Sequence, residues 1–378
     1  MHAATLVYDR HSGWSTDGAE PSSEAQAILW FGAPEVAADA RAYQGLRNRF
    51  PNAAIIGCST GGEIHGEDVM DSSGVAAVVR FDATRLRAAE RRAADFAGPR
   101  ECGLSLAQEL AADDLRAIFV LSDGLGVNGT QLIEGLTAGI SDRVVITGGL
   151  AGDGAEFGVT RVGLNSPPEP GVVAALGLYG EALRIGWGSA GGWRPFGPER
   201  TVTRSRDNVL YALDDKPALD LYKSYLGEAS AQLPGSALLF PLVIRPSLGD
   251  GYNVVRTIVG VNEADSSLIF AGDVPEGWSA QLMRGAVHQL VDGAVAAARQ
   301  AGSPAADNSS LGILISCIGR KLMMGQDVAD EVEAIADVWG PIPTVGFYSY
   351  GEISPHGFSG QCTLHNQTMT ITLFSEAA

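Results

Sequence analysis

The chain has 378 residues, a length that favours about two domains. Hydrophobic residues make up 46% and charged residues 19%, a composition that fits a globular protein and excludes a disordered one. With 26 basic and 44 acidic residues the net charge is −18, which argues against nucleic acid or an anionic membrane surface as a partner.

Targeting signals and cysteine usage indicate the compartment. Residues 1–18 contain no basic segment followed by an apolar core, and no apolar run approaches the length of a membrane span. The four cysteines form no Cys-x-x-Cys pair, so we expect neither a zinc site nor a disulfide framework. We therefore predict a cytoplasmic protein with free thiols. The cysteines are Cys58, Cys102, Cys317 and Cys362.

The first elements predict a βαβ unit. A compact apolar strand over residues 27–31 precedes Pro34, which opens a helix with apolar residues at helical spacing. A buried strand over 53–56 completes the unit. Two more strands are expected over 75–81 and 86–90.

A second unit of the same kind follows. Ser-Leu-Ala-Gln at 105–108 has the form of a capping box and predicts a helix from there to about residue 115. The continuous apolar run 117–121 is typical of a strand buried on both faces, and it ends in the turn Ser-Asp-Gly at 122–124. A helix and a strand over 144–147 close this unit.

The rest of the chain predicts a second domain of related design. Gly, Pro and Arg accumulate between residues 188 and 206, so we place a boundary there, giving domains over 24–206 and 207–378. The fold class is α/β: two related domains with mixed, largely buried sheets flanked by helices. Later strands are expected over 172–179, 183–187, 237–244, 252–261, 267–271, 311–316 and 364–373, and helices over 218–226 and from about 279 to 300.

Three apolar strands end in similar glycine turns, within residues 53–64, 144–154 and 343–355. Glycine permits the positive φ angles and close backbone approach that such turns need. Because ligand sites in α/β proteins form at the carboxyl ends of strands, the turns predict one shared ligand pocket. The alternative is that their acids cap turns and their tyrosines fill the core. The predicted pocket residues are Ser59, Thr60, Glu63, Asp153, Tyr348, Tyr350 and Glu352.

An enzymatic alternative rests on residues 57–61, which match the Gly-x-Ser-x-Gly pattern of a nucleophile elbow around Ser59. Glu352 followed by His356 or His365 would supply acid and base in a permitted chain order. An elbow needs a helix after the serine, however, and residues 62–66 are turn-like. A Ser59-dependent hydrolase is therefore the rival to a non-catalytic binding protein.

Two histidines are candidate ligands of a haem iron, because one neutral imidazole suffices for a five-coordinate haem. His288 lies beside the apolar face of the helix expected from residue 279, and His365 lies in the expected C-terminal strand. A histidine in such a place is more often a structural residue than a ligand, and that is the alternative for each of them. Haem b is thus a candidate cofactor that no sequence motif requires.

These motifs resemble the FIST family of bacterial sensory proteins, named for F-box and intracellular signal transduction proteins. The resemblance covers nearly the whole chain, as an N-terminal and a C-terminal FIST domain. We include Arg320 and Asn366, which lie in matching segments, among the expected ligand-binding residues. The matching segments are 57–64, 122–124, 148–154, 211–227, 317–320, 346–355 and 364–376.

The resemblance implies non-catalytic sensing of a small ligand in signal transduction. One branch of the family consists of stand-alone, nitric-oxide-sensing haemoproteins that act on histidine kinases or cyclic-di-GMP enzymes. The chain has no kinase, receiver or cyclase segment, which fits that branch. We expect a cytoplasmic sensor, a candidate homo-oligomer, that binds haem and thereby nitric oxide and regulates such a separate partner. An amino-acid-like ligand without haem is the alternative.

Overall fold

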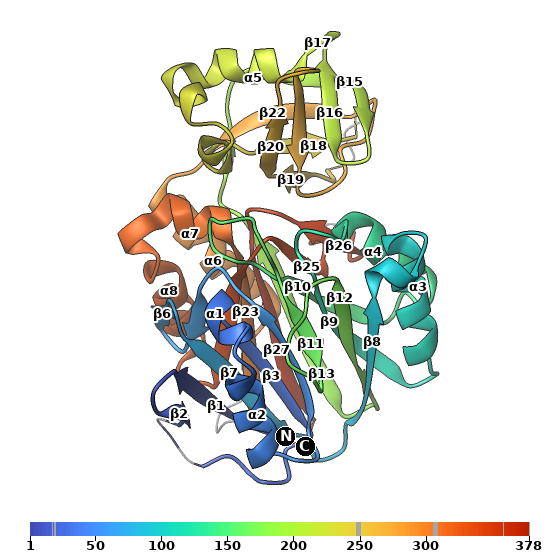
Figure 1. Ribbon diagram of the computed structural model, residues 1–378, viewed down its shortest axis with the longest axis vertical. Helices are drawn as coiled ribbons and strands as arrows, with labels where there is room; N and C mark the ends of the chain where they lie inside the picture. Colours follow the sequence, from blue (N-terminus) through green and yellow to red (C-terminus); the bar gives the residue numbers. More distant parts are fainter. Residues whose placement is uncertain (17, 19, 247–250, 305–308, 358, 378) are drawn as a thin grey trace.

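The computed structural model describes residues 1–16, 18, 20–246, 251–304, 309–357 and 359–377. Its strands form three six-stranded sheets and one nine-stranded sheet, with helices against them, which confirms the predicted α/β class. Figure 1 shows the nine-stranded sheet and helix α5 as a smaller body standing above the rest of the molecule. We call residues 194–284 the small body and the other residues the large body.

The large body contains the three six-stranded sheets. The first, in the order β11-β4-β3-β7-β1-β2, comprises β1 (His2–Asp9), β2 (Gly13–Ser15), β3 (Ala27–Gly32), β4 (Ala54–Ser59), β7 (Gly74–Arg80) and β11 (Val162–Leu164). The second, β26-β25-β10-β9-β12-β8, comprises β8 (Arg85–Arg92), β9 (Leu115–Ser122), β10 (Val145–Leu150), β12 (Val172–Tyr179), β25 (Gly351–Pro355) and β26 (Cys362–His365). The third, β13-β27-β23-β24-β5-β6, comprises β5 (Glu63–His65), β6 (Asp68–Met70), β13 (Leu183–Ala190), β23 (Ser310–Cys317), β24 (Thr344–Ser349) and β27 (Met369–Glu376).

The small body and the helices complete the fold. The nine-stranded sheet comprises β14 (Arg194–Pro195), β15 (Arg200–Arg206), β16 (Val209–Leu213), β17 (Lys216–Pro217), β18 (Leu242–Arg245), β19 (Val254–Arg256), β20 (Ile258–Asn262), β21 (Ser267–Phe270) and β22 (Ser279–Arg284). The α-helices are α1 (Pro34–Ala37), α2 (Ala40–Arg49), α3 (Pro99–Leu110), α4 (Gly129–Ala138), α5 (Ala218–Leu226), α6 (Val287–Ala301), α7 (Ile318–Met324) and α8 (Asp330–Trp339). The 3₁₀ helices are η1 (Ala93–Asp95), η2 (Gly227–Gln232), η3 (Gly235–Leu239) and η4 (Gly325–Asp327).

The three sheets of the large body follow one plan. In each, a central strand (β3, β9 or β23) lies between a parallel strand that follows it through a helical segment and an antiparallel return strand. A fourth strand (β1, β8 or β13) pairs with the other side of the return strand. The large body is therefore built from three related units: unit 1 (1–80), unit 2 (85–179) and unit 3 (183–376), which the small body interrupts.

The strand after each glycine turn crosses to the sheet of another unit. β5 of unit 1 pairs with β24 of unit 3, β11 of unit 2 with β4 of unit 1, and β25 of unit 3 with β10 of unit 2. The exchange runs once around the three units, so each sheet is completed by a neighbour. One apolar core joins all three sheets, with Phe31, Phe119 and Phe347 among its members.

The predicted boundary at residue 206 falls at the end of β15, inside the small body. Because β25 and β26 join the second sheet and β5 and β6 join the third, these two sheets combine strands from both sides of that boundary. The division into domains 24–206 and 207–378 stays a prediction about the sequence, whereas the spatial division separates residues 194–284 from the rest (Figure 1).

Two predicted helix starts are wrong. The helix expected from about residue 279 begins at Val287, because residues 279–284 form β22, which pairs with β18 and β15. The helix expected from Ser105 begins at Pro99, whose fixed φ suits the first helical turn, and residue 115 already opens β9. Hydrophobic periodicity is a local signal, so it could not predict that residues 279–284 pair with distant strands.

Three predicted strands differ in extent. Residues 235–239 form η3, so only β18 remains of the strand expected over 237–244. The strand expected over 252–261 is divided between β19 and β20. The strand expected over 364–373 is interrupted between β26 and β27, where Gln367 has a φ of +61°.

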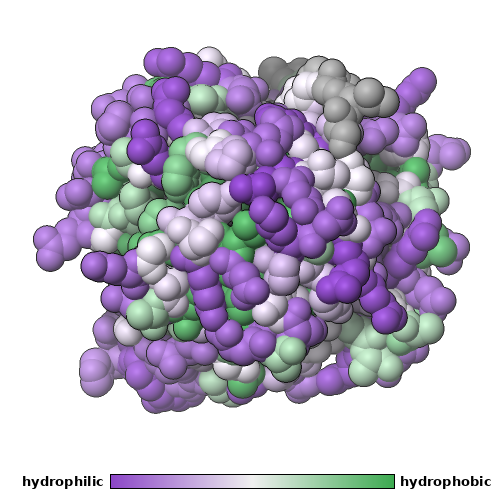
Figure 2. Space-filling model, turned by 90° about the horizontal axis from the view of Figure 1, so that it is seen from above, coloured by the Kyte–Doolittle hydropathy of each residue, from purple (hydrophilic) through white to green (hydrophobic). Residues whose placement is uncertain are grey.

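Three of the four arginines of β8 are paired with acids. Arg85, Arg91 and Arg92 form ion pairs with Asp114, Glu109 and Glu169, respectively. Seen from the side of the small body, the surface is mostly hydrophilic with smaller hydrophobic areas between (Figure 2). Within the described residues, no helix combines the length and apolar character that crossing a bilayer requires.

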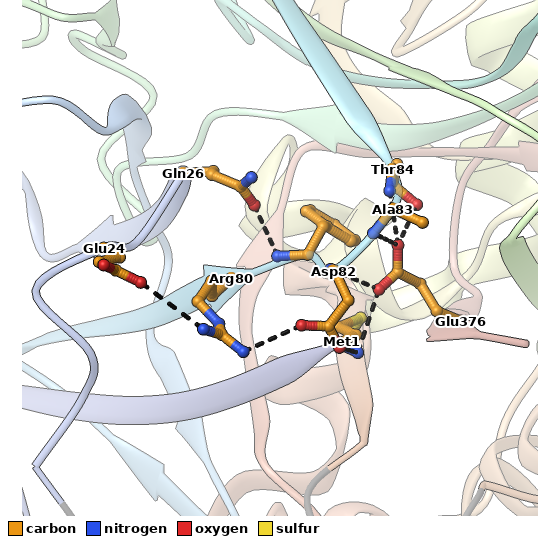
Figure 3. Close-up of polar contacts among 9 residues, drawn as sticks. Met1, Glu24, Gln26, Arg80, Asp82, Ala83, Thr84 and Glu376 are labelled. Atoms are coloured by element: carbon orange, nitrogen blue, oxygen red, sulfur yellow. Dashed lines mark hydrogen bonds and ion pairs between the residues drawn. The ribbon is translucent and has the colours of Figure 1, made fainter. Parts of the chain in front are cut away.

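Glu376, at the end of β27, joins unit 3 to the segment that links units 1 and 2 (Figure 3). Its carboxylate accepts the backbone N–H groups of Asp82, Ala83 and Thr84 at 2.8, 3.0 and 2.6 Å, and the Met1 ammonium lies 3.0 Å away. Burial alone would raise the pKa of Glu376, but these hydrogen bonds outweigh it and lower the pKa to about 2.

Glu376→Gln should lower the free energy of unfolding at pH 7 by about 2 kcal/mol, because charge-assisted hydrogen bonds become neutral ones. The pKa of Glu376 is lower in the folded protein than its ordinary 4.5, so its stabilisation is complete above that value and is lost as the pH falls toward 2. Urea unfolding at pH 7 and pH 3.5 should therefore show a difference that shrinks at the lower pH. Glu24→Gln, at a side chain that is 79% exposed, is the control and should change neither value.

Candidate functional site

The three glycine turns meet and are joined by a ring of three backbone hydrogen bonds. Each bond runs from the turn of one unit to the last strand residues of another, in the same direction around the ring. The bonds are Gly61 N–H to the Tyr348 carbonyl (2.7 Å), Tyr350 N–H to the Leu150 carbonyl (3.3 Å) and Gly152 N–H to the Ser59 carbonyl (3.0 Å). The structure thus brings together the three turns that the sequence singles out.

A glycine lies two residues before each of the three carbonyls in this ring, at positions 57, 148 and 346. An added Cβ would lie 1.8 Å from the Val120 carbonyl oxygen at Gly148 and 1.9 Å from the Leu314 carbonyl oxygen at Gly346. At Gly57 it would meet the indole of Trp30 at 2.2 Å. The repeated glycines are therefore explained by close packing behind the ring.

Glu63 and Glu352 occupy equivalent places in units 1 and 3. Each accepts a hydroxyl from the residue three positions earlier, Thr60 or Ser349, and each accepts the backbone N–H and hydroxyl of a later residue, Ser73 or Thr368. Both side chains are fully buried. Burial raises the pKa of Glu63 to about 7 and that of Glu352 to about 8, so Glu352 is mostly neutral at pH 7.

Asp153 organises the turn of unit 2. Its carboxylate accepts the N–H groups of Phe157, Gly158 and Val159 at 3.0, 2.7 and 2.7 Å. It also accepts the hydroxyl of Tyr350, and burial raises the pKa of that phenol. The ring of Phe157 stacks on Tyr350, with centroids 4.8 Å apart. Asp153 therefore shapes a loop and fixes an aromatic pair.

Arg320 and Glu331 form a fully buried ion pair beside the ring. The guanidinium also donates to the carbonyls of Gly191 and Leu290, at 2.5 and 2.9 Å. Glu331 accepts the hydroxyls of Ser316 and Tyr348, both at 2.9 Å. The two charges of this cluster are paired inside the protein, so Arg320 and Tyr348 fix the ends of β23 and β24.

A cavity of about 270 Å³ lies between the two bodies, at the carboxyl ends of β9 and β23. Residues after β9, Phe157, Cys317, Ile318 and Tyr350 line it from the large body. Asn208, Leu238 and residues around β20 and β21 line it from the small body. Leu125, which is 43% exposed, lies at its rim. Strand ends covered by a second body are the usual place for a ligand in an α/β protein.

Hydrogen bonds between the two bodies surround this cavity. Arg256 of the small body donates to the Leu364 carbonyl at 3.0 Å, and Gln367 of the large body donates to the Leu238 carbonyl at 3.0 Å. The Asn128 side chain, which caps α4, donates to Asp273 at 2.7 Å. An apolar cluster containing Trp193, Val243, Met283, Leu290 and Met324 joins the bodies on one side.

Of the predicted pocket residues, Tyr350 lines the cavity. Asn366 lies one contact away, because its side-chain oxygen accepts the N–H of Thr257, a lining residue, at 3.4 Å. The others hold the turns in place and do not line this cavity: Ser59, Thr60, Glu63, Asp153, Arg320, Tyr348 and Glu352. These positions agree with the alternative that the acids fix turns.

Sequence reasoning named several cavity segments without assigning them a role. Residues 122–124 and 317–320 belong to the segments that resemble the family, and Gly124, Cys317 and Ile318 line the cavity. Thr257, Asn208 and Phe157 carried no signal, because their place depends on how the small body docks. Burial raises the pKa of Cys317 far above its usual range, which favours the protonated thiol.

The two candidate haem ligands do not fit that role in this structure. His288 is exposed on α6, and His365 is buried with its Nε2 3.1 Å from the Ser354 carbonyl and its Nδ1 3.4 Å from the Ser189 hydroxyl. Burial lowers the pKa of His365 to about 3, so it is neutral, but neither of these histidines lines the cavity. Among the described residues no group of three His, Cys, Asp or Glu side chains is placed to hold a metal ion.

Ser59 lacks the surroundings of a nucleophile. Its side chain is fully buried, and its oxygen accepts the N–H of Arg161 at 2.9 Å. The turn after it leads into strand β5 rather than a helix. In the described part of the chain no hydrogen bond joins Ser59 to a histidine, so its hydroxyl acts as a link to unit 2.

Glu352→Gln should change the pH dependence of stability. The pKa of Glu352 is raised in the folded protein, so stability falls as the pH rises from 4.5 through 8, by about 1.4 kcal/mol for each pH unit while only the unfolded state is ionised. The variant lacks this decline, and urea unfolding at pH 6, 7 and 8 should show it gaining on the wild type. If the free energies of unfolding of Glu352→Gln and the wild type changed in parallel with pH, a buried neutral Glu352 would be contradicted. The control Glu24→Gln should change in parallel with the wild type.

Comparison with known proteins identifies the family. The FIST N domain matches residues 26–216 and the FIST C domain matches residues 218–355. The chain is 27% identical over 339 residues to an uncharacterized protein of Mycobacterium tuberculosis, found in two strains. The matched region covers 85% of this chain and 84% of that protein. It is 26% identical over 196 residues to an uncharacterized protein of Methanocaldococcus jannaschii, covering 49% of this chain and 38% of that protein.

The two domain matches follow one another along the chain and together cover most of it. They include all three glycine turns and the strand ends that line the cavity. The chain therefore belongs to the FIST family, whose domains act as signal-transduction sensors of small ligands.

Proposed function

We propose that the protein is a non-catalytic sensor that binds a small ligand in the cavity between the two bodies. The observation that carries this proposal is the shared lining: residues 124–128, 317–318 and 350 come from the large body, and residues 208, 238, 257 and 269–271 come from the small body. A ligand that contacts both bodies stabilises the arrangement in which they enclose it.

The signal is the relative position of the two bodies, read by a separate partner such as a histidine kinase or a cyclic-di-GMP enzyme. The contacts between the bodies combine the apolar cluster around Trp193 with hydrogen bonds, among them those donated by Arg256, Asn128 and Gln367. Interfaces of this kind allow relative motion more readily than large apolar ones. Ligand binding would therefore change the relative position of the two bodies and, with it, the outer surface that a partner contacts.

Filling the cavity should abolish ligand binding without unfolding the protein. Ala271 lines the cavity, and Ala271→Leu places three more carbon atoms in it. In a thermal-shift screen of small molecules, a ligand at 100 times its Kd should stabilise the wild type by about 2.7 kcal/mol and leave Ala271→Leu unchanged. Ala111→Leu, at an exposed position after α3, is the matched control and should respond like the wild type. Compounds that stabilise all three proteins equally would contradict this site, and a screen without any stabilising compound would favour an interaction scaffold.

Haem should not bind at His365 or His288. Both ring nitrogens of His365 are engaged and His288 is exposed, so neither should ligate a haem iron, and the absorption spectrum after supply of a haem precursor should be the same in the wild type, His365→Ala and His288→Ala. A Soret band that shifts with nitric oxide and disappears in His365→Ala would overturn this expectation and restore the gas-sensing branch.

A further inference from the structure

The cavity has no charge to offer a ligand. Among the described residues that line it, no side chain is ionisable to an acid or a base at neutral pH, and most are apolar. Apolar side chains come from both bodies, with Val127 and Ile318 on one side and Val259 and Phe270 on the other. A charged group moved here from water would lose its hydration without gaining a partner, at a cost of several kcal/mol.

One wall of the cavity is aromatic. Phe157 and Tyr350 both line it, and their rings are stacked at an angle of 15°. Asp153 holds the pair in place by accepting the Tyr350 hydroxyl and the Phe157 N–H. A cavity of about 150 Å³ is known to hold benzene, so one of about 270 Å³ has room for a flat molecule of roughly two fused rings.

Thr257 lines the cavity, and it carries a buried polar atom without a partner. The side-chain oxygen of Thr257 makes no hydrogen bond, although the residue is only 3% exposed. Its backbone is satisfied, because its N–H donates to Asn366 and its carbonyl accepts the Ala271 N–H. A buried hydroxyl left without a partner costs free energy that a ligand can recover.

We infer that the ligand class is an uncharged, flat, mostly apolar molecule with one hydrogen-bonding group that reaches the Thr257 hydroxyl. This inference rests on the proposed function, since it names the ligand of the same cavity. It replaces the amino-acid-like ligand that the family resemblance implies, because a zwitterion would bury an ammonium and a carboxylate beside side chains that carry no charge.

The test uses isothermal titration calorimetry on the full chain with indole as the probe and indene, its isostere without the N–H, as the matched control. Indole should bind, and tryptophan and indole-3-acetate, which add charge to the same ring, should bind at least tenfold more weakly. Thr257→Val should weaken indole by about three- to tenfold and leave indene unchanged. Thr257→Ser, which keeps the hydroxyl, should retain indole affinity.

Ala271→Leu fills the cavity and therefore shows whether a ligand binds at this site, independently of its chemical class. Val259→Phe fills the same cavity and replaces Ala271→Leu if that variant does not fold. Both residues line the cavity. Tighter binding of tryptophan or indole-3-acetate than of indole, lost in the filled variant, would overturn the ligand class and leave the proposed sensor intact. Indole binding that survives in the filled variants would overturn both, and absence of indole binding to the wild type would overturn the ligand class.

Discussion

Three backbone hydrogen bonds connect the three units of the large body at one place, because each joins the glycine turn of one unit to the strand end of another. They depend on glycines that let backbones come within reach: Gly148 and Gly346 have carbonyl oxygens where a Cβ would lie. The buried acids serve the same geometry, since Glu63 and Glu352 each tie a turn to a later segment through hydroxyl and backbone donors. The glycine turns and their acids resemble a binding motif in the sequence, but in the structure they connect the three units of the large body.

The small body forms a cavity with the large body, because residues of both line it. It is inserted between the edge strand β13 and helix α6 of unit 3, and it covers the strand ends of units 2 and 3. Arg256 illustrates the contact: its guanidinium is buried and donates to the carbonyls of Asp273 and Leu364, and burial lowers its pKa to about 10. The bodies meet through dipoles and a small apolar cluster, with a ligand-sized space between.

Local pattern predicted much of this fold. Residue type and hydrophobic period predicted the strands before the glycine turns and the helices that begin at Pro34 and shortly before Leu132. They also predicted that the three turns converge. Residues 279–284 could not, because their strand exists only through its partners β15 and β18. The cavity was equally hidden. Thr257 and Phe157 are ordinary residues in sequence, and only the docking of residues 194–284 gives them a common wall.

The exchange of strands among the three units has a consequence for how the chain reaches its folded state. β5 leaves the first unit early in the chain, yet its partner β24 is synthesised almost at the end. Unit 1 also lacks β11 until residues 162–164 are synthesised, so β4 has an unpaired edge on the growing chain up to that point. Contacts so distant in sequence slow folding and leave strand edges open to other chains. The strand exchange that completes each sheet in the finished protein therefore leaves unpaired strand edges on the nascent chain.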